Sequence, residues 1–284
     1  MKAISSKSLS DAAKEYFQSP LKHAAVSRHQ SLYHYQGSDL IRLKKTLETG
    51  LIWMSAPNNF NDPWDCKPWF DLGPLDSAEG RDLVIQQLSA LDSWKEETIQ
   101  EELRRNPVLL KHIVEEMSRE STIVFNREYR VYCLTPNENN LLMWSHYADN
   151  HKGLCLQFDV RCQQIGEAYK VHYQEQLPTS LVGAADDQET IKALLTKSDI
   201  WAYEEEYRLL ARDYLRPLGD FPLTVGNYAK LDDTALIGIV IGCQNPHIDE
   251  ILEMVVRYKP DITVRSALRL PHKYGIGYQT IHTP

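Results

Sequence analysis

The sequence predicts an α+β fold with a mixed, mainly antiparallel β-sheet core, flanking helices and a helical insertion. Short apolar or alternating runs typical of strands are interspersed with amphipathic helical segments along the whole chain. One long stretch, residues 76–118, carries apolar residues at three- and four-residue spacing among charged ones, which indicates inserted helices. No internal repeat or low-complexity linker divides the 284 residues.

Two regions are expected. Residues 1–30 are predicted to form an N-terminal helical extension, because residues 8–18 are amphipathic and Ser8 or Ser10 can serve as the N-cap. Residues 31–284 are predicted to form a single α+β domain that contains the helical insertion 76–118.

The domain is expected to open with a strand, a helix, a glycine and a second strand. Ser31–Gln36 suits a strand, and residues 39–49 have leucines at helical spacing. Gly50 is predicted to cap that helix in a left-handed conformation. Residues 51–54 form a short apolar strand, and 55–74 form a loop rich in aromatic residues and prolines.

The later elements follow from the same patterns. The remaining predicted strands cover residues 129–134, 154–158, 168–173, 203–210, 235–241, 262–268 and 277–282. The remaining predicted helices cover residues 140–149, 188–198 and 246–257. Gly153 is expected to end the helix at 140–149, and residues 177–187 are expected to form a loop.

Composition and charge exclude several classes. A net charge of −8 argues against non-specific binding to nucleic acids or anionic membranes, although a local basic patch stays open. Five scattered cysteines, with no Cys-x-x-Cys, indicate neither a disulfide framework nor a zinc ribbon. The first residues lack a signal-peptide pattern, and no apolar run has the length of a membrane span. We therefore expect a cytoplasmic protein.

The segment Trp201–Arg208 is the strongest candidate site. As a strand it would place Glu204, Glu206 and Arg208 on one face, since successive side chains point to opposite faces. Such charges are costly inside a domain unless they pair or take part in chemistry. The alternative is a surface strand with weak ion pairs.

The helix around residues 140–149 is a second candidate. Met143, His146 and Tyr147 lie on one helical face, with Trp144 on the neighbouring one. An aromatic stripe of this kind is often core packing, but His146 can also act as acid, base or ligand.

Two further segments carry weaker signals. Asn61 and Asp62, before a proline, form either a structural turn or a loop that presents polar groups and aromatic rings to a ligand. Tyr33 and Tyr35 lie on one face of the first strand and His34 on the other. The chain has no dinucleotide-binding glycine motif, phosphate loop, Gly-x-Ser-x-Gly elbow or His-Glu-x-x-His, which disfavours those enzyme classes.

Taken together, these motifs resemble a bacterial family, domain of unknown function 2971. The resemblance covers residues 31–260 and rests on four matching stretches. They are Tyr33 and Tyr35, Phe60 to Pro63, Met143, Trp144, Tyr147 and Gly153, and Trp201, Glu204, Glu206 and Arg208. The family name implies no function.

The layout is more distantly similar to ADP-ribosyltransferases, with their strand–helix–strand opening and a late glutamate. This resemblance implies that NAD is used by a bacterial effector in stress or phage defence, which acts on a nucleotide and has a protein or nucleic acid as a candidate target. The implied catalytic residues are Glu206, Glu204, His146 and Tyr147. The implied cofactor contacts are Tyr33, Tyr35, Asn61, Asp62, Trp144 and Arg208. In this scheme Glu206 stabilises the positive charge on the ribose, and Arg208 supports Glu204 or meets a phosphate.

Two alternatives stay open. In the first, the chain is a metal-dependent nuclease or hydrolase whose carboxylates bind Mg²⁺ or Mn²⁺. Its ligands would be Asp62, Asp65, Glu204, Glu206 and His146. In the second, the chain is not an enzyme, and the motifs form an aromatic-lined sensor pocket while the helical insertion contacts a partner.

Overall fold

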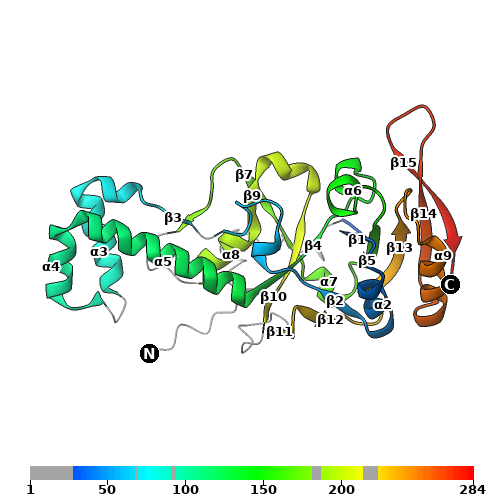
Figure 1. Cartoon of the computed structure of the whole chain (residues 1–284), viewed down its shortest axis with the longest axis horizontal. Coiled ribbons are helices and arrows are strands. Elements are labelled where there is room, and N and C mark those ends of the chain that lie inside the picture. The colour runs from blue at the N-terminus through cyan, green and yellow to red at the C-terminus, as the bar shows by residue number, and fades with distance from the viewer. Residues whose placement is uncertain (1–27, 68, 91–93, 181–186, 214–222) are drawn as a thin grey trace.

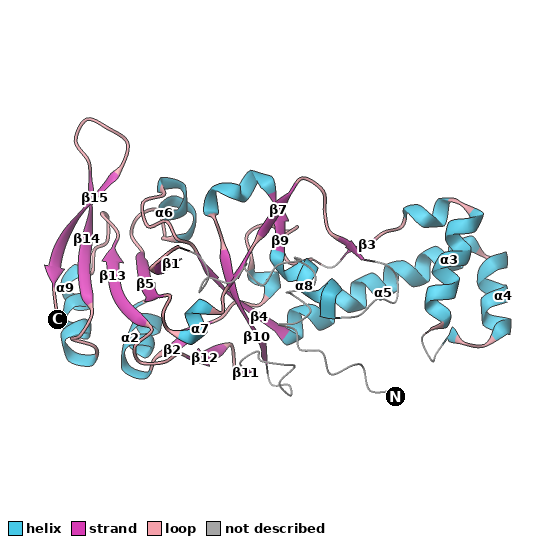
Figure 2. Cartoon of the chain, turned by 180° about the vertical axis from the view of Figure 1, so that it is seen from behind, coloured by secondary structure: helices cyan, strands magenta, loops and turns pink. Residues whose placement is uncertain are grey.

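The fold class predicted from the sequence is confirmed: helices surround a mixed, mainly antiparallel sheet core (Figure 1). The computed structural model describes residues 28–67, 69–90, 94–180, 187–213 and 223–284. The amphipathic helix expected over residues 8–18 lies outside the described residues. Figures 1 and 2 both show an elongated molecule, with helices α3 and α4 at one end and strand β15 at the other.

The larger sheet, in the described part of the chain, has five strands in the order β1-β5-β13-β14-β15. Its members are β1 (Ser31–Gln36), β5 (Leu154–Asp159), β13 (Leu236–Ile241), β14 (Thr263–Arg269) and β15 (Ile276–His282). The β13–β14 pair is parallel and the other neighbours are antiparallel. The parallel pair is joined through helix α9 (Ile248–Tyr258), as a crossover requires.

Alternation along β5 explains how this sheet is covered on both faces. Leu154, Leu156 and Phe158 are buried in a core that also contains residues of α9 and of helix α2 (Leu40–Thr49). Cys155 points to the opposite face and packs in the cluster that contains Trp144 of helix α6 (Leu141–Tyr147). The sheet therefore has α2 and α9 on one side and α6 on the other.

A second sheet lies beside the first, with the order β11-β10-β4 and with β6 also paired to β10. Its strands are β4 (Tyr129–Leu134), β6 (Tyr169–Lys170), β10 (Tyr207–Asp213) and β11 (Leu223–Thr224). The two sheets meet where β1 approaches the end of β4. There Tyr33 and Thr135 form an isolated bridge, with N···O distances of 2.7 and 2.9 Å. A bridge of one residue pair leaves the strands free to diverge on either side of it.

The inserted helices form a separate layer. Helices are found at α3 (Ala78–Ser89), α4 (Glu97–Arg105) and α5 (Pro107–Glu128), so the helices expected within residues 76–118 are present. They share their own apolar cluster, which includes Ile85, Leu103 and Leu110. Helix α5 continues to the start of β4, because no glycine or proline interrupts it after its first residue.

The remaining described elements are short. The strands are β2 (Leu51–Trp53), β3 (Trp69–Phe70), β7 (His172–Gln174), β8 (Thr179–Ser180), β9 (Thr196–Ser198) and β12 (Tyr228–Lys230). The remaining helical segments are η3 (Pro57–Asn59), η4 (Gly73–Asp76), α7 (Gln163–Gly166), α8 (Asp187–Leu195) and η6 (Asp199–Glu204). None of the helices in the described residues combines the length and the apolar character needed to span a bilayer.

The opening of the domain matches its prediction. Asp39 caps α2, because its side chain accepts a hydrogen bond from the backbone N–H of Arg42 at 3.0 Å. Gly50 ends the helix with φ 68°, the left-handed conformation expected of a C-terminal glycine.

Several predicted boundaries are wrong. The strand predicted over residues 168–173 is two short strands, β6 and β7, and the loop predicted over residues 177–187 contains β8 and the first residue of α8. Residues 188–198 are a helix only as far as Leu195, after which β9 pairs with β7. The strand predicted to contain Glu204 and Glu206 starts only at Tyr207. Glu204 ends the 3₁₀ helix η6, and Glu205 has φ 48°, a left-handed conformation that interrupts any regular element.

Gly153 does not end helix α6, as the sequence had suggested. The helix ends at Tyr147, and the left-handed turn is made by the non-glycine residues 149–151, with φ between 47° and 67°. Gly153 is required for a different reason, since a Cβ there would lie 2.1 Å from the carbonyl oxygen of Gln36. The glycine allows the turn to pack against the end of β1.

Substitution of this glycine should therefore destabilise the whole domain. We expect Gly153→Ala to lower the free energy of unfolding by about 3 kcal/mol, because backbone atoms must move apart to admit the methyl group. Urea denaturation of the full chain measures this. The control is Gly37→Ala, where the nearest atom to the new Cβ is 4.0 Å away. Equal stability of the two variants would contradict the packing argument.

Candidate functional site

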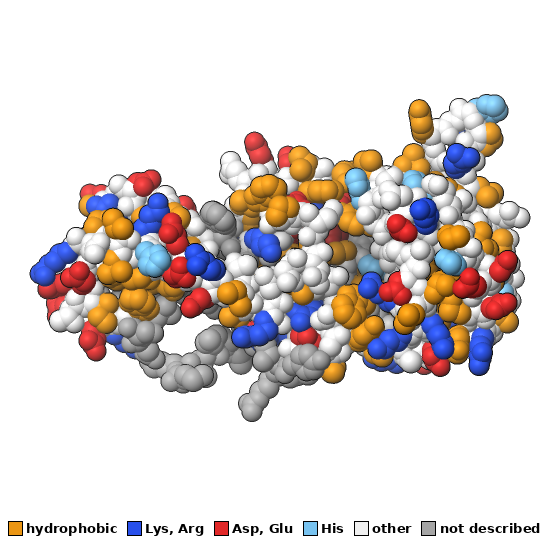
Figure 3. Space-filling model, in the orientation of Figure 1, with side chains coloured by type: hydrophobic (Ala, Val, Ile, Leu, Met, Phe, Trp, Pro, Cys, Tyr) orange, Lys and Arg blue, Asp and Glu red, His pale blue; other side chains and the backbone are white. Residues whose placement is uncertain are grey.

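A cavity of about 310 Å³ opens where the two sheets diverge. Figure 3 shows this face of the molecule hollowed over the region where Figure 1 labels β4, β1 and α6. Its lining includes Tyr33, His34, Tyr35, Gln36, Arg42, Asn59, Phe60, Asn61, Asp65, Cys133, His146, Tyr147, Lys197, Glu204 and Glu206. The lining therefore combines a cluster of buried charges with an aromatic wall that includes Tyr33, Phe60 and Tyr147.

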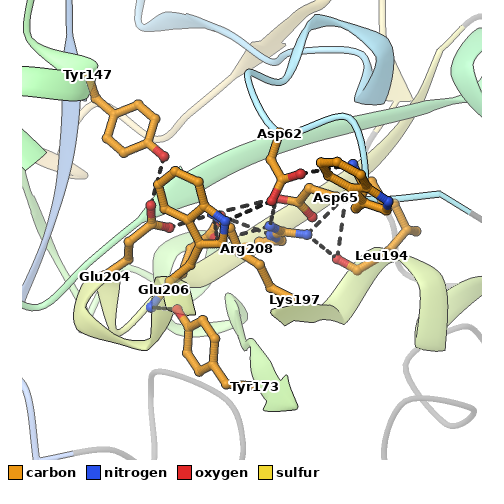
Figure 4. A network of polar contacts seen from close by, with 12 residues as sticks. Asp62, Asp65, Tyr147, Tyr173, Leu194, Lys197, Glu204, Glu206 and Arg208 are labelled. Carbon is orange, nitrogen blue, oxygen red and sulfur yellow. Dashed lines mark hydrogen bonds and ion pairs between the residues drawn. The ribbon is translucent and has the colours of Figure 1, made fainter. Parts of the chain in front are cut away.

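Arg208 organises the buried charges (Figure 4). Its Nε and Nη2 donate to the two carboxylate oxygens of Glu206, both at 2.9 Å, and Nη2 also donates to Asp65 at 2.7 Å. Its Nη1 donates to the carbonyl of Leu194 at 2.7 Å and to Sγ of Cys66 at 2.9 Å. A guanidinium has five N–H donors, so all of them are used within the protein.

Lys197, in β9, lies at the centre of three carboxylates. Its Nζ is 2.5 Å from Glu204, 3.3 Å from Glu206 and 3.5 Å from Asp65. The same ammonium group lies 5.1 Å from the ring centre of Trp201, which adds a cation–π contact. Because Lys197 and the three carboxylates are at least 93 % buried, their charges would be costly without this pairing.

Glu204 connects the charge cluster to helix α6. Its Oε1 accepts a hydrogen bond of 2.7 Å from the hydroxyl of Tyr147, and its Oε2 accepts one of 2.5 Å from Lys197. Asn140, which caps α6, donates to the carbonyl of Tyr203 at 3.0 Å and so ties the helix to the turn that carries Glu204. Both carboxylate oxygens of Glu204, which lines the cavity, are thus held by hydrogen bonds.

The surroundings shift the pKa values of Glu204 and Glu206 in opposite directions. Burial, and then the negative charge of Glu206, raise the pKa of Glu204 above its ordinary value despite Lys197. Burial alone would also raise the pKa of Glu206, but Arg208 and Lys197 outweigh it and hold that pKa at about 2. Paired carboxylates whose pKa values are pushed apart are typical of sites that divide acid–base roles between them.

The low pKa of Glu206 predicts an acid-sensitive fold. Its ordinary pKa is 4.5 and its folded pKa is about 2, so Glu206 contributes stability above pH 4.5 that is lost as the pH falls toward 2. We expect Glu206→Gln to be less stable at neutral pH and to lose less further stability across this window. Urea midpoints at several pH values measure this. Glu205→Gln, at an exposed position, should keep the wild-type slope. Equal slopes for wild type and Glu206→Gln would contradict the assignment.

The structure brings most of the predicted site residues together. Those that line the cavity are Tyr33, Tyr35, Asn61, His146, Tyr147, Glu204 and Glu206. The roles of the two glutamates differ from the expectation that Arg208 supports Glu204. Arg208 binds Glu206 and makes no hydrogen bond to Glu204 in the described residues. Glu206 is therefore the anchored carboxylate, and Glu204 is the one that faces the aromatic wall through Tyr147.

Three of the predicted cofactor contacts, Arg208, Trp144 and Asp62, do not line the cavity. Arg208 is fully buried with every donor used, and Trp144 is fully buried with Nε1 donating to the carbonyl of Glu138 at 2.9 Å. Asp62 forms the turn that the sequence offered as an alternative, accepting from the backbone N–H of Trp64 at 2.9 Å. Its other oxygen accepts from Nε1 of Trp201 at 2.7 Å, so both carboxylate oxygens of Asp62 are used within the protein.

His34 lines the cavity but is held as part of its wall. Its ring stacks on Tyr132 at 3.9 Å between centroids, and Nδ1 donates to the carbonyl of Cys133 at 2.8 Å. Burial lowers the pKa of His34 to about 4, so the ring is neutral at neutral pH.

Sequence reasoning missed Lys197 and Arg42. Lys197 follows an apolar run, and nothing in the local pattern marks it as a site residue. Charge balance is the signal that could have found it, because Arg208 alone does not compensate two glutamates and an aspartate. Arg42 is one of several basic residues on a helix that looks surface-exposed in the sequence.

Comparison with known proteins bears on the segment that builds the charge cluster. Residues 143–209 match the family model described as Protein of unknown function (DUF2971). The matched segment runs from α6 to the start of β10 and contains Tyr147, Lys197, Glu204 and Glu206. It supports the family resemblance seen in the sequence. No curated protein and no solved structure matches the chain significantly.

The structure also bears on the metal-site alternative. Across the described residues, no group of three or more histidine, cysteine, aspartate or glutamate side chains is arranged to hold a metal ion. Asp65, Glu204 and Glu206 do converge, but the ammonium group of Lys197 occupies the point between them. A cation bound there would have to displace Lys197.

Proposed function

We propose that this protein cleaves the N-glycosidic bond between nicotinamide and ribose in NAD, and that Glu204 is the carboxylate that faces the reacting sugar. The observation that carries this proposal is the position of Glu204. Its carboxylate is fixed by Tyr147 and Lys197 at the end of a cavity with aromatic walls. Cleavage of this bond develops positive charge on the sugar, and a fixed carboxylate stabilises such charge best in a site that excludes water.

The bond changes are as follows. The bond between C1′ of the ribose and the pyridinium nitrogen breaks, and its electron pair leaves with neutral nicotinamide. A water molecule, or a nucleophile on a target molecule, forms the new bond to C1′. The proton of that nucleophile passes to Glu204, whose raised pKa suits it to accept a proton.

The cavity walls suit the planar ring of nicotinamide. Tyr33, Phe60 and Tyr147 offer aromatic faces, and Asn61 offers an amide that can pair with a carboxamide. A volume of about 310 Å³ is at the lower end of the range for small-molecule sites. We therefore propose that nicotinamide and its ribose occupy the cavity, while the adenine half of NAD lies outside it.

The expected similarity to ADP-ribosyltransferases is consistent with the position of the cavity. The opening strand β1 and the turn that carries the late glutamates contribute to one site, from segments about 170 residues apart in the sequence. A role as a bacterial effector in stress or phage defence stays a prediction.

The direct test is incubation of the purified full chain with NAD. We expect release of free nicotinamide, followed by chromatography, and transfer of labelled ADP-ribose when a lysate supplies a target. Release with water alone would indicate a hydrolase, and release only with lysate would indicate a transferase. Absence of nicotinamide release in both conditions, together with no NAD binding by calorimetry, would overturn the proposal.

A further inference from the structure

The end of the cavity formed by the β1–α2 connection contains unused hydrogen-bond donors. Gln36, the last residue of β1, is 7 % exposed, and its Nε2 has no hydrogen-bond partner among the described residues. A buried amide donor left unpaired costs free energy comparable to a lost hydrogen bond. Because Gln36 lines the cavity, a bound ligand is positioned to supply the missing acceptor.

Arg42 brings a positive charge to the same cavity from the first turn of α2. Its ion pair is with Asp39, where Nε lies 3.8 Å from Oδ2 and both side chains are more than one-third exposed. Its guanidinium also lies 5.3 Å from the ring centre of Trp53, and the rest of the described chain offers it no other ion pair. An exposed ion pair at this distance is weak, so Arg42 keeps most of its capacity to bind an anion.

The two basic residues that line the cavity differ in how far carboxylates compensate their charge. Lys197 is compensated by three carboxylates, whereas the one ion pair of Arg42 among the described residues is the exposed 3.8 Å contact with Asp39. The guanidinium of Arg42 also contributes to the low pKa of His34, after burial, which indicates that its charge is felt inside the cavity. The β1–α2 end of the cavity is thus the end that attracts an anion.

We propose that Gln36 and Arg42 form an anion subsite that binds a phosphate group of the nucleotide substrate. This inference rests on the proposed function and deepens it, since it requires the substrate to carry a phosphate and excludes the bare nucleoside. A guanidinium can donate two parallel hydrogen bonds to phosphate oxygens, and the Gln36 amide supplies another donor. The subsite would hold the ribose 5′-phosphate while the glycosidic bond lies near Glu204.

Calorimetric titrations of the full chain test the subsite with two kinds of probe. The first is inorganic pyrophosphate, which reports on the anion site alone. The second is the pair nicotinamide mononucleotide and nicotinamide riboside, which differ by one phosphate. We expect the wild type to bind pyrophosphate and to prefer the mononucleotide by about tenfold or more, as charged hydrogen bonds predict.

Arg42→Met should weaken pyrophosphate binding about tenfold and remove the preference for the mononucleotide, because it keeps the aliphatic stem but removes the charge. Gln36→Leu should reduce pyrophosphate binding and the preference for the mononucleotide to a smaller degree. The matched control is Lys45→Met on the same helix. Lys45 lies 3.5 Å from the ring centre of Tyr228 and does not line the cavity, so its removal should change neither binding measurement.

The outcomes separate the subsite from the proposed reaction. If pyrophosphate binding depends on Arg42 but NAD is never cleaved, the subsite stands and the proposed function fails. If NAD is cleaved and Arg42→Met changes neither its KM nor pyrophosphate binding, the subsite is wrong and the function stands. Equal loss in Arg42→Met and Lys45→Met would also overturn the subsite, since it would indicate non-specific attraction to helix α2.

Discussion

Replacement of Glu204 by glutamine should lower the rate of nicotinamide release by about 100- to 1,000-fold, the effect typical of removing one fixed electrostatic group from an active site. The KM for NAD should change little, because the amide keeps the shape of the carboxylate. The amide can still form hydrogen bonds with Tyr147 and Lys197, so the fold should be retained. Initial rates of nicotinamide release measure this effect.

The neighbouring glutamate provides the control for this experiment. Glu205→Gln, at an exposed position next to Glu204, should keep wild-type turnover. Thermal melting of each variant separates loss of chemistry from loss of fold. Glu204→Gln with more than about a tenth of wild-type activity would contradict the role of Glu204, because one proton-transfer or charge-stabilising group contributes at least about 100-fold.

Replacement of Arg208 by methionine should be the most destabilising single change in the site. We expect the free energy of unfolding to fall by about 3–5 kcal/mol, because the change leaves buried carboxylates without their main cation. Glu206 would lose its bidentate partner and Asp65 its shortest ion pair, of 2.7 Å. Urea denaturation measures this, and the double variant Arg208→Met/Glu206→Gln should recover part of the loss.

The matched control for this change is Arg161→Met. Arg161 also pairs bidentately with a carboxylate, since its Nε donates to Oδ1 and its Nη2 to Oδ2 of Asp159, but its side chain is 90 % exposed. Solvent screens this pair, so we expect no measurable change in the urea midpoint. If the two variants are equally stable, the charge cluster contributes no more to the fold than a surface ion pair.

Helices and strands that are determined by neighbouring residues in the chain were predictable from the sequence. The bounds of β1 and β4 follow from short strand patterns between turn residues, and α2 follows from leucine spacing between Asp39 and Gly50. The inserted helices were also predictable, because their spacing persists over many residues. The error at Gly153 has a tertiary cause, since that glycine is needed for the close approach of Gln36 rather than for the end of a helix.

The sequence predicted which residues belong to the candidate site better than it predicted the role of each residue. A cluster of costly charges marked residues 204–208, and aromatic residues marked the helix at Tyr147, and the structure places both at one cavity. The division of labour between Glu204 and Glu206 could not be read from the sequence. It depends on a left-handed residue at position 205, which replaces strand alternation by a turn, and on Lys197, which pairing with β7 brings beneath both carboxylates.

The sequence by itself determined the fold class, the main local elements and the presence of charged residues that must be paired if buried, because propensity, spacing and desolvation act through neighbouring residues and composition. Only the tertiary structure decided that Arg208 is fully used within the protein, that Glu204 faces the aromatic wall, and that Gln36 and Arg42 keep unused donors at the other end of the cavity. The physical reason is that pairing and burial are set by contacts between segments far apart in the chain, and these contacts leave no periodic signal in the sequence.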